Sequence, residues 1–414
     1  MSKLSSEKPL YLIGASVRAC AASLRRSPVG ASYQIKTCDL FADADLQSVA
    51  DASICKAVDY PQGLGDWLNR EAPGYVIYTG GIENHPELIE TVATRHELLG
   101  CNTAIVRKCR DPFLLAATLA QQGIATAKIQ TQRPKSGRWL EKPIASCAGF
   151  NIRQFPTEAK RESAVSPTDS DQYDEAARTD CYFQERIDGR ATAGLYVSDG
   201  KSTRLMGITH GLTVADLPIY NQLKLPPFLY AGSIGPVATT QHETAEWLRL
   251  GEIATDAFDL LGVFGIDAIV DPASDIVPIE INPRFTASME LIDIAWNTSV
   301  AQQHIDAYCG VNHPVNHEPC ENATMAKLIV YANSPTHISR TLHRELLDGS
   351  SFSSTGIQIA DVPVAGSEIP PGSPICTLLV PSGQMPDVLD EYVDAANQQV
   401  KDALHFFSQQ SEID

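Results

Sequence analysis

Short apolar runs alternate with amphipathic stretches over the first hundred residues of the chain. The runs at residues 10–13, 34–38 and 75–78 have the composition of buried strands, and the patterns at 62–70 and 86–99 predict helices between and after them. Alternation of buried strands with helices is typical of a parallel sheet, in which ligands gather at the carboxyl ends of the strands. The amino-terminal part of the chain is therefore predicted to be an α/β domain.

A second kind of pattern begins after residue 240. Apolar positions spaced for one face predict a helix over residues 242–261, and two strands are predicted to follow it, at 265–270 and 276–281. Because side chains alternate along a strand, Glu280 and Asn282 are expected on the same side of the second one.

The tail changes character again. Strand-like runs and many proline and glycine turns between residues 325 and 384 predict a small β-rich extension, and the pattern at 385–407 predicts a closing helix. With 414 residues the chain is too long for one ordinary core, so two or three domains are expected.

Charge narrows the classes of partner. The chain has 32 basic and 50 acidic side chains, a formal charge of −18, which repels polyphosphate backbones and anionic membrane surfaces. We therefore expect no nucleic-acid or membrane partner, whereas a nucleotide carried with magnesium is compatible with an acidic protein. No signal peptide and no run of 18 apolar residues is seen, and this favours a cytoplasmic location.

Candidate metal ligands lie on the two strands after the long helix. Magnesium with ATP requires hard oxygen ligands, commonly one or two carboxylates, and Asp267, Glu280 and Asn282 supply such a set. The plainer alternative is that both carboxylates face solvent on an ordinary hairpin. Near the start of the chain, Gly14-x-Ser16 lacks the further glycines of a dinucleotide fingerprint, so a Rossmann reductase is disfavoured.

Three motifs in order resemble those of the ATP-grasp superfamily. Asp267 with Glu280-Ile281-Asn282 resembles the metal-binding strands of that family, Trp139-Leu140-Glu141-Lys142-Pro143 resembles its strand with a phosphate-binding lysine, and Phe183-Gln184-Glu185-Arg186-Ile187-Asp188-Gly189 resembles its adenine hinge. The amino-terminal part is similar to a branch of carboligases related to biotin carboxylase. The resemblance implies an α/β ATP-grasp fold that follows an amino-terminal parallel-sheet domain.

The same resemblance implies a division into domains. A Rossmann-like pre-ATP-grasp domain is expected at residues 1–108 and an ATP-grasp domain at 109–324, with a lid part at about 125–200 and a metal-binding part at about 201–324. The β-rich cap and closing helix would occupy 325–414.

Nucleotide contacts follow from the resemblance, residue by residue. Lys142 would contact the ATP phosphates and Gln184 the adenine amino group. The remaining expected contacts are an earlier cation at Arg107 or Lys108, the backbone of Glu185 to Ile187 along the base, and Asp188 near the ribose. Two departures concern this site: the glycine-rich lid is reduced to Ala145-Ser146-Cys147-Ala148-Gly149-Phe150, and Ala191 falls where an acidic ribose ligand is common.

Metal and catalytic roles are implied in the same way. Asp267, Glu280 and Asn282 would hold one or two Mg²⁺ ions, with Mn²⁺ as an alternative ion, so that Asp267 serves catalysis through the metal. Arg284 would stabilise an acyl phosphate or a substrate carboxylate through its fork of donors. Gly80, Gly81, Glu83 and Arg18 are expected to form the pocket for the second substrate.

The implied reaction is ATP-dependent ligation of a small carboxylate to a small amine through an acyl phosphate, which requires no nucleophilic side chain. Relatives in the biosynthesis of one-carbon carriers such as methanofuran and tetrahydromethanopterin make that pathway an expectation, and a homodimer is a further one. Two alternatives stay open, a biotin-carboxylase-like carboxylase acting on bicarbonate and a nucleotide-binding regulatory protein without catalysis.

Overall fold

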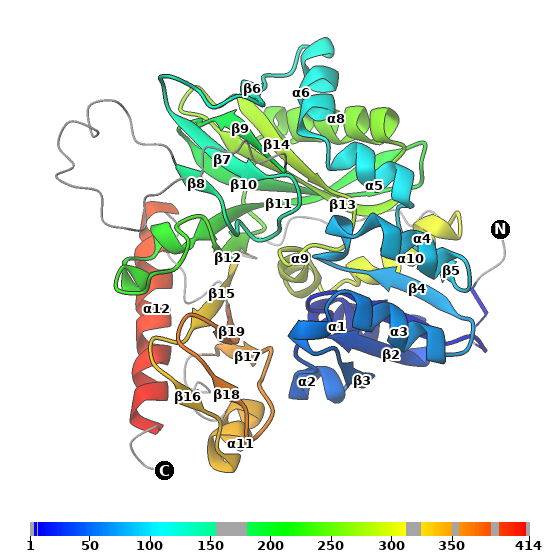
Figure 1. Ribbon diagram of the computed structural model, residues 1–414, viewed down its shortest axis with the longest axis vertical. Helices are drawn as coiled ribbons and strands as arrows, with labels where there is room; N and C mark the ends of the chain where they lie inside the picture. The colour runs from blue at the N-terminus through cyan, green and yellow to red at the C-terminus, as the bar shows by residue number, and fades with distance from the viewer. Residues whose placement is uncertain are drawn as a thin grey trace.

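The computed structural model of the chain describes residues 4–5, 7–154, 180–311, 324–349, 356–381 and 389–410. Within these ranges the strands form sheets of five, eight, four and two strands, flanked by helices (Figure 1). The predicted mixed α/β fold, with a parallel amino-terminal sheet and antiparallel sheets after it, is confirmed.

The amino-terminal sheet has the strand order β3-β2-β1-β4-β5, and all of its pairings are parallel. Alternate residues of β1 join two different cores: Leu10 and Leu12 pack with α1 and α10, whereas Tyr11 and Ile13 pack with α3 and α4. Helices on both faces explain why the strands are continuous apolar runs. The elements are β1 (Leu10–Ile13), α1 (Arg18–Arg26), β2 (Ile35–Asp39), α2 (Ala44–Gln47), β3 (Asp51–Ile54), α3 (Gln62–Arg70), β4 (Tyr75–Tyr78), α4 (Pro86–Ala93), β5 (Glu97–Leu98) and α10 (Val300–Tyr308).

The carboxyl ends of β1 and β4 meet at one edge of this sheet. The backbone amide of Ala15 donates to the carbonyl of Gly80 over 2.9 Å, and a Cβ on Gly14 would lie 2.0 Å from Thr79 Oγ1. Glycine is therefore needed at position 14 because the two strand ends pass so close together. The segment after β4 leads into a short 3-10 turn, η3 (Ile82–Asn84), at the same edge.

Two short helices, α5 (Thr103–Cys109) and α6 (Pro112–Gln121), lead to a four-stranded antiparallel sheet, the lid sheet, with the order β6-β9-β7-β8. In its central pairing Lys142 lies opposite Tyr182 and Leu140 opposite Gln184. The strands are β6 (Ile129–Gln130), β7 (Trp139–Pro143), β8 (Arg153–Gln154) and β9 (Cys181–Glu185).

The largest sheet is antiparallel, with the order β14-β13-β10-β11-β12-β15-β19-β17. Helix α8 (Gln241–Phe258) covers part of one face, where Trp247 packs with Tyr196 and Phe264. The strands are β10 (Arg190–Ser198), β11 (Thr203–Thr213), β12 (Tyr230–Gly235), β13 (Gly262–Val270), β14 (Ile276–Asn282), β15 (Met325–Tyr331), β17 (Gln358–Ala360) and β19 (Pro374–Val380).

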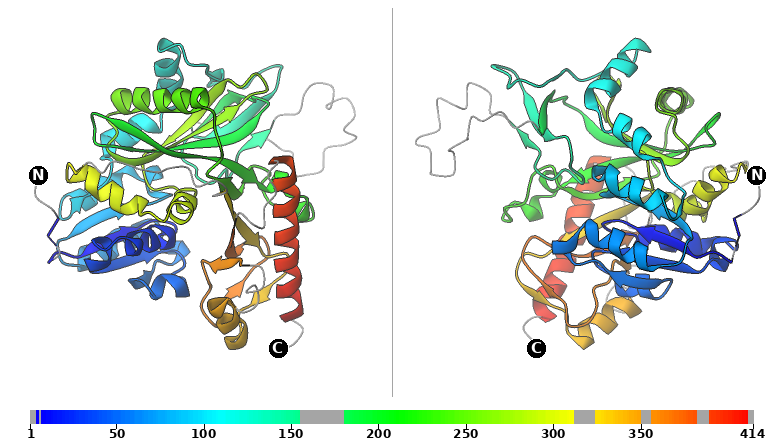
Figure 2. Two further views of the ribbon diagram at one scale, coloured as in Figure 1. Left: turned by 180° about the vertical axis from the view of Figure 1, so that it is seen from behind. Right: turned by 45° about the vertical axis from the view of Figure 1, so that its right-hand side comes forward.

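The β-rich carboxyl-terminal part continues this sheet, because β15 pairs with β12 and then with β19. Helix α12 (Leu389–Gln410) runs along its outer side, as Figure 2 shows. Helix α11 (Arg340–Asp348) and a two-stranded ribbon of β16 (Thr336–His337) and β18 (Glu368–Ile369) complete it. Buried side chains of α12 join a core shared with β12 and β15, so this extension and the main sheet pack as one body.

Several predicted boundaries shift for local reasons. The long helix begins at Gln241, after Thr240 and Glu243 form a capping box, and it ends at Phe258 because Asp259 adopts a left-handed conformation with φ 58°. The helix predicted over 86–99 ends at Ala93, and residues 97–98 pair with β4 instead.

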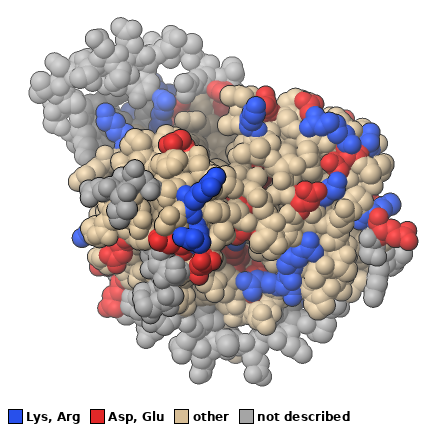
Figure 3. Space-filling view, turned by 90° about the horizontal axis from the view of Figure 1, so that it is seen from below, with Lys and Arg blue, Asp and Glu red and all other residues tan. Residues whose placement is uncertain are grey.

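The distribution of surface charge and the length and polarity of the helices concern possible nucleic-acid and membrane partners. Lysine and arginine are interspersed with aspartate and glutamate on the face viewed in Figure 3. Across the described ranges, every helix is too short or too polar to cross a lipid bilayer.

Candidate active site

Asp267 on β13 and Glu280 on β14 lie directly opposite each other in the strand register. Burial and the neighbouring Glu280 carboxylate raise the pKa of Asp267 to about 6, against the opposing charges of Arg284 and Lys142. Two carboxylates that repel each other in this way favour a shared cation. The register thus brings together two of the three predicted metal ligands.

Asn282 and Arg284 continue this arrangement towards the amino-terminal domain. Asn282 Nδ2 donates to Asp267 Oδ2 over 2.8 Å, and Arg284 Nη2 donates to Asn282 Oδ1 over 3.0 Å. Arg284 Nε in turn donates to Glu83 Oε1 over 2.8 Å. Although burial opposes it, the Arg284 guanidinium holds the pKa of Glu83 below its usual range. One hydrogen-bonded chain therefore joins the predicted metal strand to η3.

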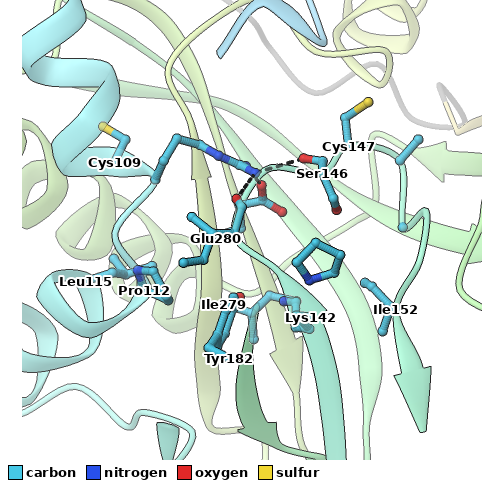
Figure 4. A pocket seen from close by; sticks show the side chains of 15 residues that line it. Cys109, Pro112, Leu115, Lys142, Ser146, Cys147, Ile152, Tyr182, Ile279 and Glu280 are labelled. Atoms are coloured by element: carbon cyan, nitrogen blue, oxygen red, sulfur yellow. Dashed lines mark hydrogen bonds and ion pairs between the residues drawn. The ribbon is translucent and has the colours of Figure 1, made fainter. Parts of the chain in front are cut away.

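A cavity with about 480 Å³ of empty volume, including solvent at its mouth, lies in front of Glu280. Lys142 and Tyr182 of the lid sheet line the side across from Glu280, and the loop with Ser146 and Cys147 lines another (Figure 4). The Lys142 ammonium is 5.8 Å from the centre of the Tyr182 ring and donates to Gln184 Oε1 over 2.9 Å. A buried cation thus lies in the same cavity as a carboxylate, an arrangement suited to a charged phosphate chain with a metal.

A second, smaller cavity of about 210 Å³ adjoins the first and shares lining residues with it. Its walls are mainly apolar, with the side-chain amide of Gln184 as a polar group that is suited to recognise a base. The lining residues are Pro112, Leu115, Ala116, Thr126, Ala127, Ile129, Gln184, Pro278 and Ile279. The two adjoining cavities form one cleft, with an apolar end that is suited to a base and a charged end that is suited to phosphates.

Four predicted nucleotide contacts are not brought to this cleft. Glu185 pairs with Lys128 over 3.2 Å, and Asp188 is exposed and pairs with Arg138. Ile187 is half-buried, Arg107 is exposed on α5, and neither is among the residues that line the two cavities. Asp188 therefore has a surface partner where a ribose contact was expected.

Arg110 is the cation that the sequence reasoning missed. It lies in the turn between α5 and α6, lines the larger cavity and forms an ion pair with Glu280. A recognisable signal existed in the sequence, because Asp111 followed by Pro112 is a helix start, so that Arg110 had to lie in a turn rather than on the preceding helix.

The single glycine of the reduced lid loop, Gly149, is required by a close backbone contact. Gly149 has φ 76°, and a Cβ there would lie 1.8 Å from the carbonyl oxygen of Phe228. The next contact is a backbone hydrogen bond of 2.9 Å from Tyr230 to the carbonyl of Ala148. The loop of residues 145–150 is thus fixed against β12 in this structure, and only glycine fits where it crosses Phe228.

The structure places Arg18, which was expected in the second-substrate pocket, among buried carboxylates. Arg18 is buried and its guanidinium is bonded to Glu290 and Asp361, while Lys327 Nζ donates to Glu290 over 2.8 Å. Its donors therefore serve a buried junction between α1, α9 (Met289–Ala295) and the loop after β17. Gly80 and Glu83, by contrast, both lie beside Arg284.

The donor set fits magnesium. Asp267 and Glu280 offer hard carboxylate oxygens, and Mg²⁺ commonly takes one or two protein carboxylates and completes its shell with phosphates and water. The amide oxygen of Asn282, the third predicted ligand, accepts from Arg284 in this structure. Among the residues that the structure describes, no cluster of three or more His, Cys, Asp or Glu side chains could hold a metal by itself.

A cleft between a lid sheet and a larger antiparallel sheet, with Lys142 and Glu280 in its lining, is the arrangement of the ATP-grasp fold. Residues 89–288 match the family model described as the ATP-grasp domain, so the resemblance expected from the sequence is confirmed. Residues 89–288 of the chain therefore form an ATP-grasp domain.

Solved structures of low sequence identity share the fold. The chain is similar to N5-carboxyaminoimidazole ribonucleotide synthetase in complex with ADP, at 15% identity and TM-score 0.67, over 99% of this chain and 100% of that one. It is similar to the biotin carboxylase domain of 2-oxoglutarate carboxylase from Hydrogenobacter thermophilus, solved with MgADP and bicarbonate, at 14% identity and TM-score 0.65, over 90% and 86%. A third match is L-amino acid ligase from Bacillus licheniformis, at 13% identity and TM-score 0.63, over 97% and 98%. Among curated proteins no match is found.

Proposed function

We propose that this enzyme activates a small carboxylate with ATP and Mg²⁺ as an acyl phosphate and joins it to a small amine. The observation that carries the proposal is the pair Asp267 and Glu280 in register, with Lys142 lining the same cavity as Glu280. Mg²⁺, when bound by Asp267, Glu280 and Asn282, would neutralise charge on the transferring phosphoryl group.

The side chains have separate tasks in the proposed reaction. Lys142 holds the phosphate chain, and Gln184 orients the base. A substrate carboxylate oxygen attacks the γ-phosphorus and ADP leaves; the amine nitrogen then attacks the acyl carbon, phosphate leaves, and the departing phosphate takes the amine proton. Arg284 has one donor beyond its bonds to Glu83, Asn282 and the Phe285 carbonyl, and with it binds the carboxylate and the acyl phosphate.

Two oxygen atoms near Arg284 that receive no hydrogen bond favour an amine as the second substrate. Glu83 Oε2 and Asn84 Oδ1 are buried and receive no hydrogen bond, and Glu83 is the direct partner of Arg284. Buried acceptors of this kind are suited to N–H donors of a ligand. The amine of the second substrate would therefore lie at the carboxyl edge of the amino-terminal sheet, close to the activated carboxylate.

A carboxylase acting on bicarbonate is a second candidate, since one similar structure is a biotin carboxylase domain solved with bicarbonate. The same description names a domain dimer, and a homodimer of this chain stays a prediction, as do the one-carbon carrier pathway and the use of Mn²⁺.

ADP release separates these functions. The full chain is incubated with ATP and Mg²⁺ in separate reactions that contain pooled small carboxylates, pooled amines, both pools together, bicarbonate, or none of these. Turnover that needs both a carboxylate and an amine is expected. Stimulation by bicarbonate alone would support the carboxylase, and nucleotide binding without any stimulated turnover would support the regulatory protein and overturn the proposed ligase.

A further inference from the structure

Arg110 connects the candidate metal site to the lid loop. One guanidinium nitrogen, Nη1, pairs with Glu280 Oε1, and the other, Nη2, donates to the carbonyls of Ile144 and Ser146 over 2.8 Å each. The dashed lines that end at Glu280 and Ser146 in Figure 4 mark two of these bonds. A single side chain thus holds a predicted metal ligand and the loop that follows the phosphate-binding strand.

The third nitrogen of Arg110 has no partner. Nε is buried and without a hydrogen bond, and the side chain is only 13% exposed. A buried guanidinium donor left without a hydrogen bond costs stability, and an acceptor atom of a ligand would remove that cost. Because the same cavity contains Lys142, the acceptor that fits is an anionic oxygen of a phosphate.

Glu280 cannot serve Arg110 and a divalent ion equally well. Its carboxylate is neutralised by the guanidinium in this structure, whereas the proposed function assigns the same carboxylate to magnesium. A cation already on that carboxylate opposes a second one by direct repulsion, and it also prevents Glu280 and Asp267 from facing each other uncompensated.

We infer that Arg110 is a stand-in cation for the metal site, which leaves Glu280 when nucleotide and metal bind and turns to the phosphate oxygens. This inference rests on the proposed nucleotide and metal site and does not depend on the identity of the acid or the amine.

The test compares Arg110→Ala with wild type in two binding measurements on the full chain. Affinity for Mn²⁺ alone is measured by electron paramagnetic resonance of the free ion, and affinity for a nonhydrolysable ATP analogue with Mg²⁺ by calorimetry. Removal of the stand-in cation should strengthen Mn²⁺ binding about tenfold or more, because Glu280 is then uncompensated. Loss of the phosphate contact should weaken nucleotide binding by about tenfold to 100-fold.

Matched variants keep the result interpretable. Arg249→Ala removes an arginine from α8 that donates to the Gln122 carbonyl at the surface, and it should change neither affinity. Arg110→Lys retains the charge without the fork, so it should restrain Mn²⁺ binding as wild type does while still weakening nucleotide binding. If Arg110→Ala weakens or does not change Mn²⁺ binding, Arg110 only positions Glu280 and the inference is overturned, as it is if nucleotide affinity is unchanged. If wild type binds no nucleotide, the proposed function itself fails.

Discussion

Arg18 and Asp361 are 343 residues apart in the chain, yet Arg18 Nε and Nη2 donate to the two oxygens of the Asp361 carboxylate over 2.9 and 3.2 Å. The pair fastens the loop after β17 to α1, so it ties the carboxyl-terminal extension to the first domain. Although burial opposes it, Arg18 and Lys327 hold the pKa of Asp361 well below its usual range.

Arg18→Met should therefore destabilise the protein strongly. It leaves Glu290 and Asp361 buried with only Lys327 as a cationic partner, and breaking a buried ion pair in this way costs about 3–5 kcal/mol. Urea denaturation measures the change in the free energy of unfolding. Lys8→Met is the matched control, because the Lys8–Glu97 pair is half exposed and should contribute less than about 1 kcal/mol. Equal effects of the two variants would refute this account of the junction.

The buried carboxyl group of Asp43 should make the free energy of unfolding depend on pH. Burial and the carboxylates of Asp361, Asp39 and Asp45 raise its pKa from 3.8 to about 9, against the opposing charge of Arg18. The folded state therefore holds a proton that the unfolded state releases. The contribution of Asp43 is fully present below pH 3.8 and is lost as pH rises through about 9.

Asp43→Asn mimics the protonated acid and should remove this dependence. The melting temperature of the variant relative to wild type should rise steadily between pH 5 and pH 9, values chosen to span the predicted window. Thermal unfolding followed by circular dichroism at several pH values measures the difference. A constant difference over the whole range would show that Asp43 is already ionised in the folded protein.

Substitutions of Lys142 and Glu280 should have different effects, the first on nucleotide affinity and the second on the Mg²⁺ requirement. Lys142→Met removes the buried phosphate contact and should weaken binding of the ATP analogue by about 10- to 100-fold. Glu280→Gln keeps the shape but removes a charged oxygen ligand, so ADP release should fall by about 100-fold and need more Mg²⁺. Steady-state rates over a range of Mg²⁺ concentrations provide the comparison. A Glu280→Gln variant with an unchanged Mg²⁺ requirement would place the metal elsewhere.

A substitution of Glu83 should weaken binding of the amine substrate more than binding of the nucleotide. Glu83→Gln retains the shape but replaces one acceptor oxygen with a donor, so the KM for the amine should rise about tenfold or more while nucleotide affinity changes little. Initial rates at varied amine concentration, together with calorimetry of nucleotide binding, test this. If nucleotide affinity falls as much as amine affinity, Glu83 acts through Arg284 and the metal strand rather than on the amine.

Sequence patterns predicted local elements well where burial is uniform. The strand ranges 10–13 and 75–78 match β1 and β4, because strands covered on both faces give unbroken apolar runs. Three residues of the predicted site, Lys142, Gln184 and Glu280, line the two cavities, because they lie on regular strands whose register fixes the direction in which their side chains face.

Other features depend on contacts between distant segments. No pattern in the sequence near Arg18 predicts its partner Asp361. The pairing of β12 with β15, which joins the β-rich extension to the main sheet, is likewise a contact between distant segments. Arg107 lies in the last turn of α5, whereas Arg110 lies beyond the end of that helix. The helix start at Asp111 and Pro112 marks this boundary in the sequence, but only the folded chain shows that the turn brings Arg110 to Glu280.

The most direct test of the central claim is a crystal structure of the full chain with a nonhydrolysable ATP analogue and Mg²⁺. We predict a metal ion at about 2.0–2.1 Å from carboxylate oxygens of Asp267 and Glu280, with Lys142 on the phosphates and the base beside Gln184. A nucleotide bound outside this cleft, or a metal that contacts neither Asp267 nor Glu280, would contradict the account.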